Sequence, residues 1–207
     1  MEMQNVQSNA DTLTNTLTAK TRHLLMIIAL TTLCNSQTIA QQDYAIDNSH
    51  TSVIFSISHF RIGYLYGRFN RCSGRVALDQ FDSSLSEFSF KIESNSIDTN
   101  NADRDTALKS VQFLDAASYP SIQFESTSVR EKDETYFADG TLRIKGVAKK
   151  VTLPFRLLGT GEGPMGKTRI GMLCKFKVKR SEYGITEMEK NIGDDVAITF
   201  SFQAVRK

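Results

Sequence analysis

Apolar and polar residues alternate one by one along most of the chain after residue 50. In Glu87–Glu93, for example, Phe88, Phe90 and Ile92 are separated by polar residues. A two-residue period places the apolar side chains of a strand on one face, which is typical of antiparallel sheets with one buried and one wet face. The alternation predicts strands at residues 52–58, 87–93, 122–125, 141–145, 151–158, 169–179 and 196–204.

An eighth strand, residues 64–79, changes phase along its length. Phe69 has an odd number, whereas Val76 and Leu78 have even numbers, so a regular strand would turn Phe69 away from the other two. One extra residue corrects this phase. We therefore predict a β-bulge between Phe69 and Gly74.

Eight antiparallel strands without a separate helical layer predict an all-β fold, a closed eight-stranded antiparallel barrel with one short helix between strands. A two-sheet sandwich is the competing architecture. A barrel of eight strands is just wide enough to be filled by side chains or to hold one small ligand. The sequence therefore leaves two uses of the interior open.

The short helix is expected at residues 103–115. Leu108, Val111 and Leu114 recur there at helical spacing. Either Asp103 or Asp105 can cap the first turn, and their negative charge suits the positive end of the helix dipole. The helix can close one end of the barrel or pack on one side of it.

Residues 1–40 are predicted to be a cleaved secretory signal peptide with a long polar lead. Basic residues precede the apolar run Leu24–Leu30, and a small-x-small site, Thr38–Ala40, follows it. This order is typical of an export signal, and the run is shorter than the ~20 apolar residues of a membrane span. We expect cleavage near Ala40, which leaves a single barrel domain over residues 41–207. A buried amphipathic helix is the alternative.

The three cysteines allow more than one interpretation. Cys34 could carry a lipid anchor, but Leu33 stands directly before it, where lipid-modified cysteines need a small residue. Cys72 and Cys174 could pair in an oxidising compartment, or be two small buried apolar side chains. We favour unpaired cysteines.

Side chains for catalysis or metal binding are scarce in the sequence. Asp47 lies three residues before His50, close enough to orient it. The spacing between His50 and His59 matches no standard metal site, and no Gly-x-Ser-x-Gly motif is present. We therefore predict no catalytic residues, no metal site and no cofactor.

The charge of the chain excludes one class of partner. The formal net charge is +2, from 25 basic and 23 acidic residues, which is too small to predict nucleic-acid binding. Lys175, Lys177, Lys179 and Arg180 form a basic stripe at strand spacing. Its default interpretation is a solvated outer face, and contact with anionic head groups or a membrane surface is the alternative.

The aromatic residues are 13 Phe and no Trp among 207 residues. Phe has no polar atom, so this many rings need an apolar environment. Strand phase turns seven of them inward: Phe55, Phe88, Phe90, Phe124, Phe155, Phe176 and Phe200. These rings could form a dense core or line an apolar pocket, and the residues by themselves leave both open.

A series of short motifs follows one order along residues 43–206. They are Tyr44–His59, Gly67–Phe69 with Gly74, Ser96–Thr99, Arg104–Asp105, Phe113–Asp115, Tyr119–Ser126, Gly140–Val147, Lys150–Leu153, Arg180 and Tyr183–Gly184. In this order they resemble the YceI-like family. The stretch from Ser96 to Ser126 is the most specific.

The resemblance implies a lipocalin-like eight-stranded barrel that is exported to the periplasm. It also implies a long polyisoprenoid or other amphiphilic molecule in an elongated apolar tunnel, and no shared catalytic site. Asp47, His50, Arg104, Asp105 and Arg180 match recurrent polar positions of the family. We interpret them first as structural ties and second as contacts to a ligand head.

Our main hypothesis is a periplasmic carrier that sequesters an isoprenoid lipid, such as a quinone or its precursor, without breaking a bond. The partners expected are this lipid and no nucleic acid, and the sequence leaves transient membrane-surface contact and a homodimer open. The ligand-binding candidates follow from strand phase. They are Val53, Phe55, Ile57, Phe69, Phe88, Phe90, Ile92, Ile122, Phe124, Leu142, Ile144, Leu153, Phe155, Met172, Phe176, Ile198 and Phe200.

Two other classes of function stay open at this point. The first is an enzyme of isoprenoid or stress-related chemistry that uses Asp47 and His50 to handle a proton. The second is a barrel with a solid core that binds a partner in a stress response. A fully filled interior would favour this second class.

Overall fold

The computed structural model describes residues 41–163 and 166–207. Its strands are β1 (Gln41–His59), β2 (Gly63–Phe69), β3 (Cys72–Asp79), β4 (Glu87–Glu93), β5 (Ile97–Asp98), β6 (Ser121–Lys132), β7 (Thr135–Ile144), β8 (Val147–Glu162), β9 (Thr168–Lys179) and β10 (Ile192–Arg206). The α-helix α2 spans Ala102–Lys109, and short 3-10 turns lie at Ser83–Leu85, Ser94–Ser96 and Arg180–Tyr183. The predicted signal peptide and Cys34 lie outside the described residues. Within the described part of the chain, no helix is long and apolar enough to cross a membrane.

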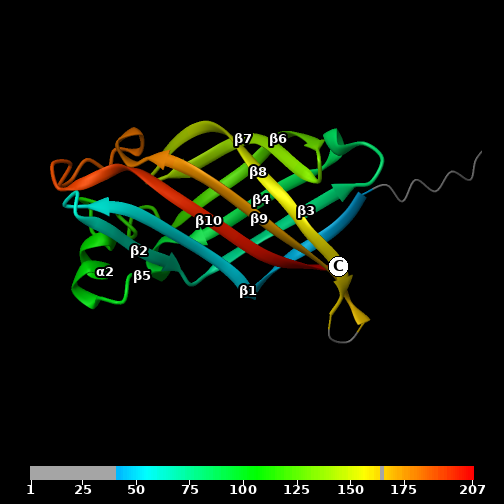
Figure 1. The fold of residues 1–207 in the computed structure, drawn as a ribbon, viewed down its shortest axis with the longest axis horizontal. Coiled ribbons are helices and arrows are strands. Elements are labelled where there is room, and N and C mark those ends of the chain that lie inside the picture. Colours follow the sequence, from blue (N-terminus) through cyan, green and yellow to red (C-terminus); the bar gives the residue numbers. More distant parts are fainter. Residues whose placement is uncertain (1–40, 164–165) are drawn as a thin grey trace, which may run out of the picture. The chain divides into compact units, whose positions relative to one another are not determined.

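The strands form one antiparallel sheet that closes on itself (Figure 1). Their order is β10-β9-β8-β7-β6-β4-β3-β1-β2-β5, and β10 also pairs with β1. β3 and β2 pair with successive parts of β1, and β4 and β5 pair with β3 and β2 in turn. Each of these pairs of short strands therefore fills one position of the barrel. The predicted eight-stranded antiparallel barrel is confirmed.

The β-bulge predicted between Phe69 and Gly74 within a single strand is instead a break between two strands. β2 ends at Phe69 and β3 begins at Cys72. β1 pairs with β3 over Gln41–Ala45 and with β2 over Val53–His59. The break thus lies where β1 exchanges one partner for the other.

Several strands are longer than side-chain alternation predicts. β1 begins at Gln41 instead of near residue 52, because its first residues pair with both β3 and β10. β6 and β7 extend through polar residues to a turn at Asp133 and Glu134. Backbone pairing continues in these segments although neither face carries a regular apolar pattern.

The helix is shorter than predicted. α2 ends at Lys109, so the expected continuation to residue 115 is wrong. Asn101, rather than an aspartate, caps its first turn. After the helix, the Leu114 N–H donates to the carbonyl of Leu108 at 3.1 Å, which closes a turn wider than a helical one. The chain therefore folds back where the apolar spacing suggested another helical turn.

The two ends of the barrel differ. Figure 1 shows α2 at the same end as the turn between β1 and β2 and the loop between β9 and β10. Toward the other end, large side chains fill the interior completely. The side chains under 2% exposed include Tyr44, Phe88, Phe155, Phe202, Ile170, Met172, Val76 and Cys174. Part of the barrel is therefore a solid core.

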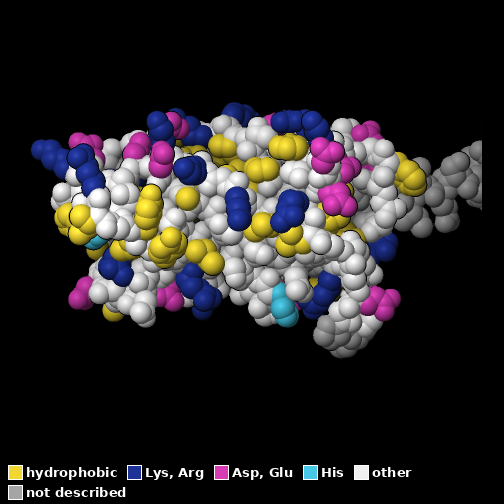
Figure 2. Space-filling view, viewed as in Figure 1, with side chains coloured by type: hydrophobic (Ala, Val, Ile, Leu, Met, Phe, Trp, Pro, Cys, Tyr) yellow, Lys and Arg dark blue, Asp and Glu magenta, His cyan; other side chains and the backbone are white. Residues whose placement is uncertain are grey.

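The outer surface carries both signs of charge. On the face shown in Figure 2, Lys and Arg side chains are interspersed with Asp and Glu side chains. This mixture agrees with the net charge of +2. Of the predicted basic stripe, Lys175, Lys177 and Lys179 are exposed, but Arg180 is buried and does not belong to it.

Removing one ring from the solid core should be costly. Phe155 is fully buried, and its ring stacks on Phe88 with centroids 4.6 Å apart. Phe155→Ala is expected to lower the free energy of unfolding by about 3–5 kcal/mol, measured by urea denaturation. Phe81→Ala is the control, because Phe81 is 82% exposed; it should change stability by no more than ~0.5 kcal/mol. Equal stabilities of the two variants would contradict a solid core at this place.

Candidate functional site

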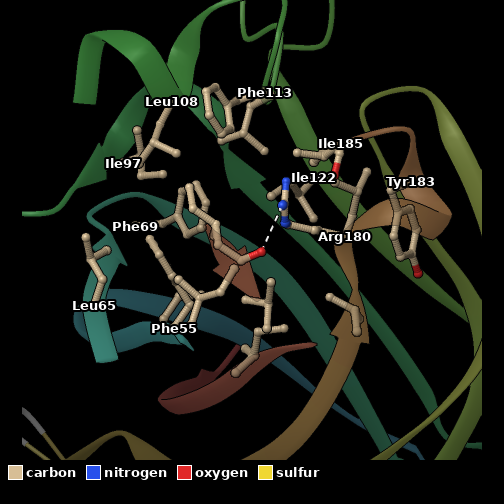
Figure 3. A pocket seen from close by; sticks show the side chains of 18 of the residues that line it. Phe55, Leu65, Phe69, Ile97, Leu108, Phe113, Ile122, Arg180, Tyr183 and Ile185 are labelled. Atoms are coloured by element: carbon tan, nitrogen blue, oxygen red, sulfur yellow. Dashed lines mark hydrogen bonds between the residues drawn. The ribbon is translucent and has the colours of Figure 1, made fainter. Parts of the chain in front are cut away.

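A cavity of about 310 Å³ lies inside the barrel at the end where α2 is found. Strand side chains line it from within, and α2 and the loop between β9 and β10 complete its wall (Figure 3). Ten of the candidates from strand phase border it: Val53, Phe55, Ile57, Phe69, Ile92, Ile122, Leu142, Ile144, Phe176 and Ile198. Strand phase therefore located much of the wall.

The remaining candidates lie deeper in the barrel. Phe90, Phe124, Leu153 and Phe200 border a second void of only about 30 Å³, which shares part of its wall with the cavity. Phe88, Phe155 and Met172 border neither space and belong to the solid core. As ligand contacts, all of the candidates remain predictions.

Much of the cavity wall was missed in the sequence. Val178 and Val196 share the inward phase of their strands and could have been found by it. Others lie outside regular strands, where no periodicity indicates a direction. They include Ala107 and Leu108 of α2, Phe113 and Leu114 of the following turn, and Tyr183, Ile185 and Met188 of the loop between β9 and β10.

Arg180 borders the cavity and organises the loop beside it. Its side chain is buried, and its guanidinium donates to the carbonyls of Gly193 (2.9 Å), Ile185 (3.0 Å), Glu187 (2.7 Å) and Ile192 (3.2 Å). Figure 3 shows this guanidinium pointing toward the space between Phe69 and Ile122. One cation thus fixes the backbone of the loop that walls the cavity, as the first interpretation of Arg180 proposed.

Arg104 ties α2 to the barrel in a similar way. Its Nε donates to Thr99 Oγ1 at 2.8 Å, and a terminal nitrogen donates to the Thr99 carbonyl at 2.7 Å. Asp105 accepts from the Thr99 N–H and hydroxyl at 2.9 and 2.6 Å. Both side chains therefore hold the start of α2 against the end of β5.

Two arginines, Arg104 and Arg180, and one histidine, His59, border the cavity. Among the residues that the structure describes, no Asp or Glu borders it. The rest of the wall is apolar apart from the hydroxyl of Tyr183. A positive wall disfavours a cationic head group and suits a neutral or an anionic one.

Asp47 and His50 lie away from this cavity. Asp47 Oδ2 is 2.8 Å from His50 Nδ1 and accepts from Arg169 at 2.7 Å, while Asp47 Oδ1 accepts from the Ser49 hydroxyl at 2.6 Å. None of these residues borders the cavity. They sit at the irregularity in the pairing of β1 with β10 between Asp47 and Thr51. The cluster holds this bulge together.

The geometry of the cluster does not match a catalytic relay. The Ser49 hydroxyl lies 3.1 Å from His50 Nδ1, the same nitrogen that faces Asp47. A relay needs the nucleophile on one ring nitrogen and the carboxylate on the other. The arrangement therefore supports a structural role for Asp47 and His50.

Cys72 and Cys174 are free and buried, so the prediction of unpaired cysteines is confirmed. Burial raises the pKa of both thiols to about 12. Since the thiolate is the reactive form, neither side chain is set up as a nucleophile. Over residues 41–163 and 166–207, no group of three His, Cys, Asp or Glu side chains is arranged to hold a metal ion.

The cavity, the barrel and the motif order can be compared with known proteins. The YceI-like domain model matches residues 44–204. The chain belongs to the YceI-like family. Protein YceI of Salmonella newport is 32% identical over 188 residues, which cover 90% of this chain and 98% of that protein. The resemblance seen in the motifs is therefore confirmed.

Solved structures share the YceI-like barrel. The crystal structure of the Campylobacter jejuni YCEI protein is 27% identical and superimposes with a TM-score of 0.65, covering 72% of this chain and 90% of that one. A polyisoprenoid binding domain from Saccharophagus degradans is 16% identical, with a TM-score of 0.61, and covers 79% of this chain and 98% of that one. This second likeness concerns the fold.

The role of Arg180 can be tested by a conservative change. A lysine carries its three donors on one nitrogen and cannot reach four carbonyls arranged around a guanidinium. Arg180→Lys should lower the free energy of unfolding by about 1–3 kcal/mol, since a carbonyl loses its donor. Amide hydrogen exchange should also become faster between residues 185 and 193. Lys179→Gln, next to it but exposed, should change neither quantity, and unchanged exchange in Arg180→Lys would disprove the proposed tie.

The Asp47 cluster predicts a pH dependence of stability. Hydrogen bonds from Ser49, then Arg169 and His50, hold the pKa of Asp47 well below its usual range. Ionised Asp47 therefore stabilises the fold above its unfolded-state pKa of about 4, and this contribution is lost as the pH falls through the lower folded-state value.

Asp47→Asn should accordingly be less stable than the unmodified protein at pH 7, with the difference shrinking below about pH 4. Thermal unfolding across this pH range measures it. Asp133→Asn, at the turn between β6 and β7, is the control and should follow the unmodified protein throughout. A stability difference for Asp47→Asn that is independent of pH would contradict the role assigned to the carboxylate.

Proposed function

We propose that this protein is a periplasmic carrier that sequesters a polyisoprenoid or a related amphiphilic lipid inside its barrel. The observation that carries the proposal is the cavity of about 310 Å³ with an almost entirely apolar wall. A polar substrate would gain little from such a wall, whereas an apolar chain gains from every surface it removes from water. The name of the Saccharophagus degradans domain, which has the same fold, points to the same ligand class.

Binding would require only burial of the tail. Each Å² of apolar surface removed from water contributes ~25 cal/mol. The cavity wall already has its shape, so few side chains need to be ordered when the tail enters. No bond is formed or broken in this process, which is the behaviour of a carrier or storage protein.

The head group would stay near the basic side chains of the wall. Arg104, Arg180 and His59 border the cavity, and within residues 41–163 and 166–207 no acidic side chain borders it. A quinone or a quinone precursor offers oxygen atoms to such donors, and so does an acidic head. Lipids with an amine head would be disfavoured by the like charge.

The other partners of the carrier remain predictions. A lipid carrier must meet a membrane to load or unload, and Lys175, Lys177 and Lys179 offer an exposed basic stripe for transient contact with one. A homodimer also remains open. The proposal of a periplasmic location rests on the signal-like sequence of residues 1–40.

The two alternative classes receive less support. The Asp47 and His50 pair lies apart from the cavity, so it has no apolar substrate to act on. A solid barrel fits only the part of the interior in which Phe88, Phe155 and Phe202 are fully buried. Carriage of a lipid accounts for both the filled part and the hollow part.

Organic extraction and mass spectrometry of protein purified from its native periplasm test the proposal. Val196→Trp would fill the cavity, because Val196 borders it, whereas Asp195→Trp places the same ring at the exposed neighbouring position of the same strand, β10. The unmodified protein and Asp195→Trp should yield one amphiphilic lipid at similar amounts, and Val196→Trp should lose most of it. Equal yields from the two variants, or no lipid from the unmodified protein, would refute carriage in this cavity.

A further inference from the structure

The inward side chains change character along the barrel axis. On β4 they run from Phe88 through Phe90 to Ile92, and on β10 from Phe202 through Phe200 to Ile198. In both strands the first ring belongs to the solid core, the second borders the small void, and the isoleucine borders the cavity. The interior therefore has three levels along the axis: a filled level in the solid core, a middle level beside the small void, and a hollow level at the cavity.

The middle level, beside the small void, is made of aromatic rings that contact one another. Phe90, Phe124 and Phe200, which we call the phenylalanine floor, come from β4, β6 and β10. Phe90 lies edge-on to Phe200 with centroids 5.0 Å apart and stacks beside Phe124 at 6.4 Å. All three are at most 5% exposed. The floor closes the inner end of the small void, and this void shares part of its wall, including Ile92 and Ile198, with the cavity.

Rings of the solid core support the floor from below. Phe202 lies 4.8 Å from Phe200 and 5.4 Å from Phe90, and Phe155 lies 5.2 Å from Phe90. A floor ring cannot swing inward without displacing these fully buried neighbours. Close-packed interiors resist such displacement. The floor is therefore a fixed end to the interior space that the cavity and the small void form together.

The volume above the floor limits what can enter. A cavity of 150 Å³ in another protein holds one benzene molecule, with its six carbons. On that scale, about 310 Å³ holds on the order of a dozen carbons, or two to three isoprene units. A longer tail must leave its remaining part outside the wall.

We propose that the phenylalanine floor sets the length of lipid tail that the barrel encloses, at about a dozen carbons. The proposal rests on the lipid-binding function proposed above. Phe90, Phe124 and Phe200 would then determine specificity for the length of the tail, although the ligand contacts them only with the end of its tail. Affinity then depends on tail length up to this limit and not beyond it.

A homologous series of ligands makes the limit measurable. The probes are saturated fatty acids from octanoic to stearic acid, whose acidic head suits the basic wall, titrated into lipid-free protein by isothermal calorimetry. Each methylene that enters the cavity should lower the Kd about fourfold. The Kd of the unmodified protein should stop falling near dodecanoic acid.

Two changes should move this break point in opposite directions. Phe90→Leu removes part of the floor and should shift it to a longer acid. Ile198→Phe places a ring in existing space one level above the floor and should shift it to a shorter acid, which keeps the test valid if Phe90→Leu unfolds. Phe88→Leu is the matched control, since Phe88 lies on the same strand as Phe90 but borders neither space. Its break point should equal that of the unmodified protein.

The results separate the length limit from carriage itself. A Kd that keeps falling up to stearic acid, or a break point that stays in place in both Phe90→Leu and Ile198→Phe, overturns the limit and leaves carriage intact. No binding of any acid by the folded protein overturns both. Opposite shifts in the two variants, with none in Phe88→Leu, establish the floor as the determinant of length.

Discussion

The diameter of a closed eight-stranded barrel is the constraint on which the rest of this structure depends. The pairing of β10 with β1 fixes that diameter by backbone hydrogen bonds, so the interior cannot shrink to suit smaller side chains. Phe rings are long enough to meet across the axis, as Phe90 and Phe200 do. Nearer the end with α2, the shorter branched side chains of Ile92 and Ile198 take the place of these rings on the same two strands, and a space remains that the rings of neighbouring strands border without filling. One barrel therefore contains a core at one level and a cavity at another.

The hollow level would be open to water without segments that are not strands. α2 and the loop between β9 and β10 supply this part of the wall, and each is held by an arginine. Arg104 bonds Thr99 at the end of β5, and Arg180 bonds four carbonyls of the loop. These groups place positive charge beside an apolar space. The same side chains that stabilise the wall thus bias which head groups can lie there.

The sequence allowed the architecture to be predicted well, because alternation reports which face of a strand is buried. Strand positions and the change of phase after Phe69 followed from this pattern, whereas the preference for unpaired cysteines did not depend on it. The extents of β1 and of α2 did not. β1 extends to Gln41 through pairing with distant strands, and α2 stops at Lys109 because the chain folds back by a bond between Leu114 and Leu108. Both depend on contacts that no local period contains.

The sequence by itself determined that the apolar side chains of eight strands face one enclosed interior, and its motif order determined the YceI-like family. It could not determine which of these side chains fill the interior and which surround a space. Phe88, Phe90 and Ile92 have the same phase on one strand, and only the register between strands gives each of them a level along the axis. That register also decides which rings meet, since contact across a barrel joins residues far apart in the chain. The tertiary structure therefore decided where the cavity lies and where it ends.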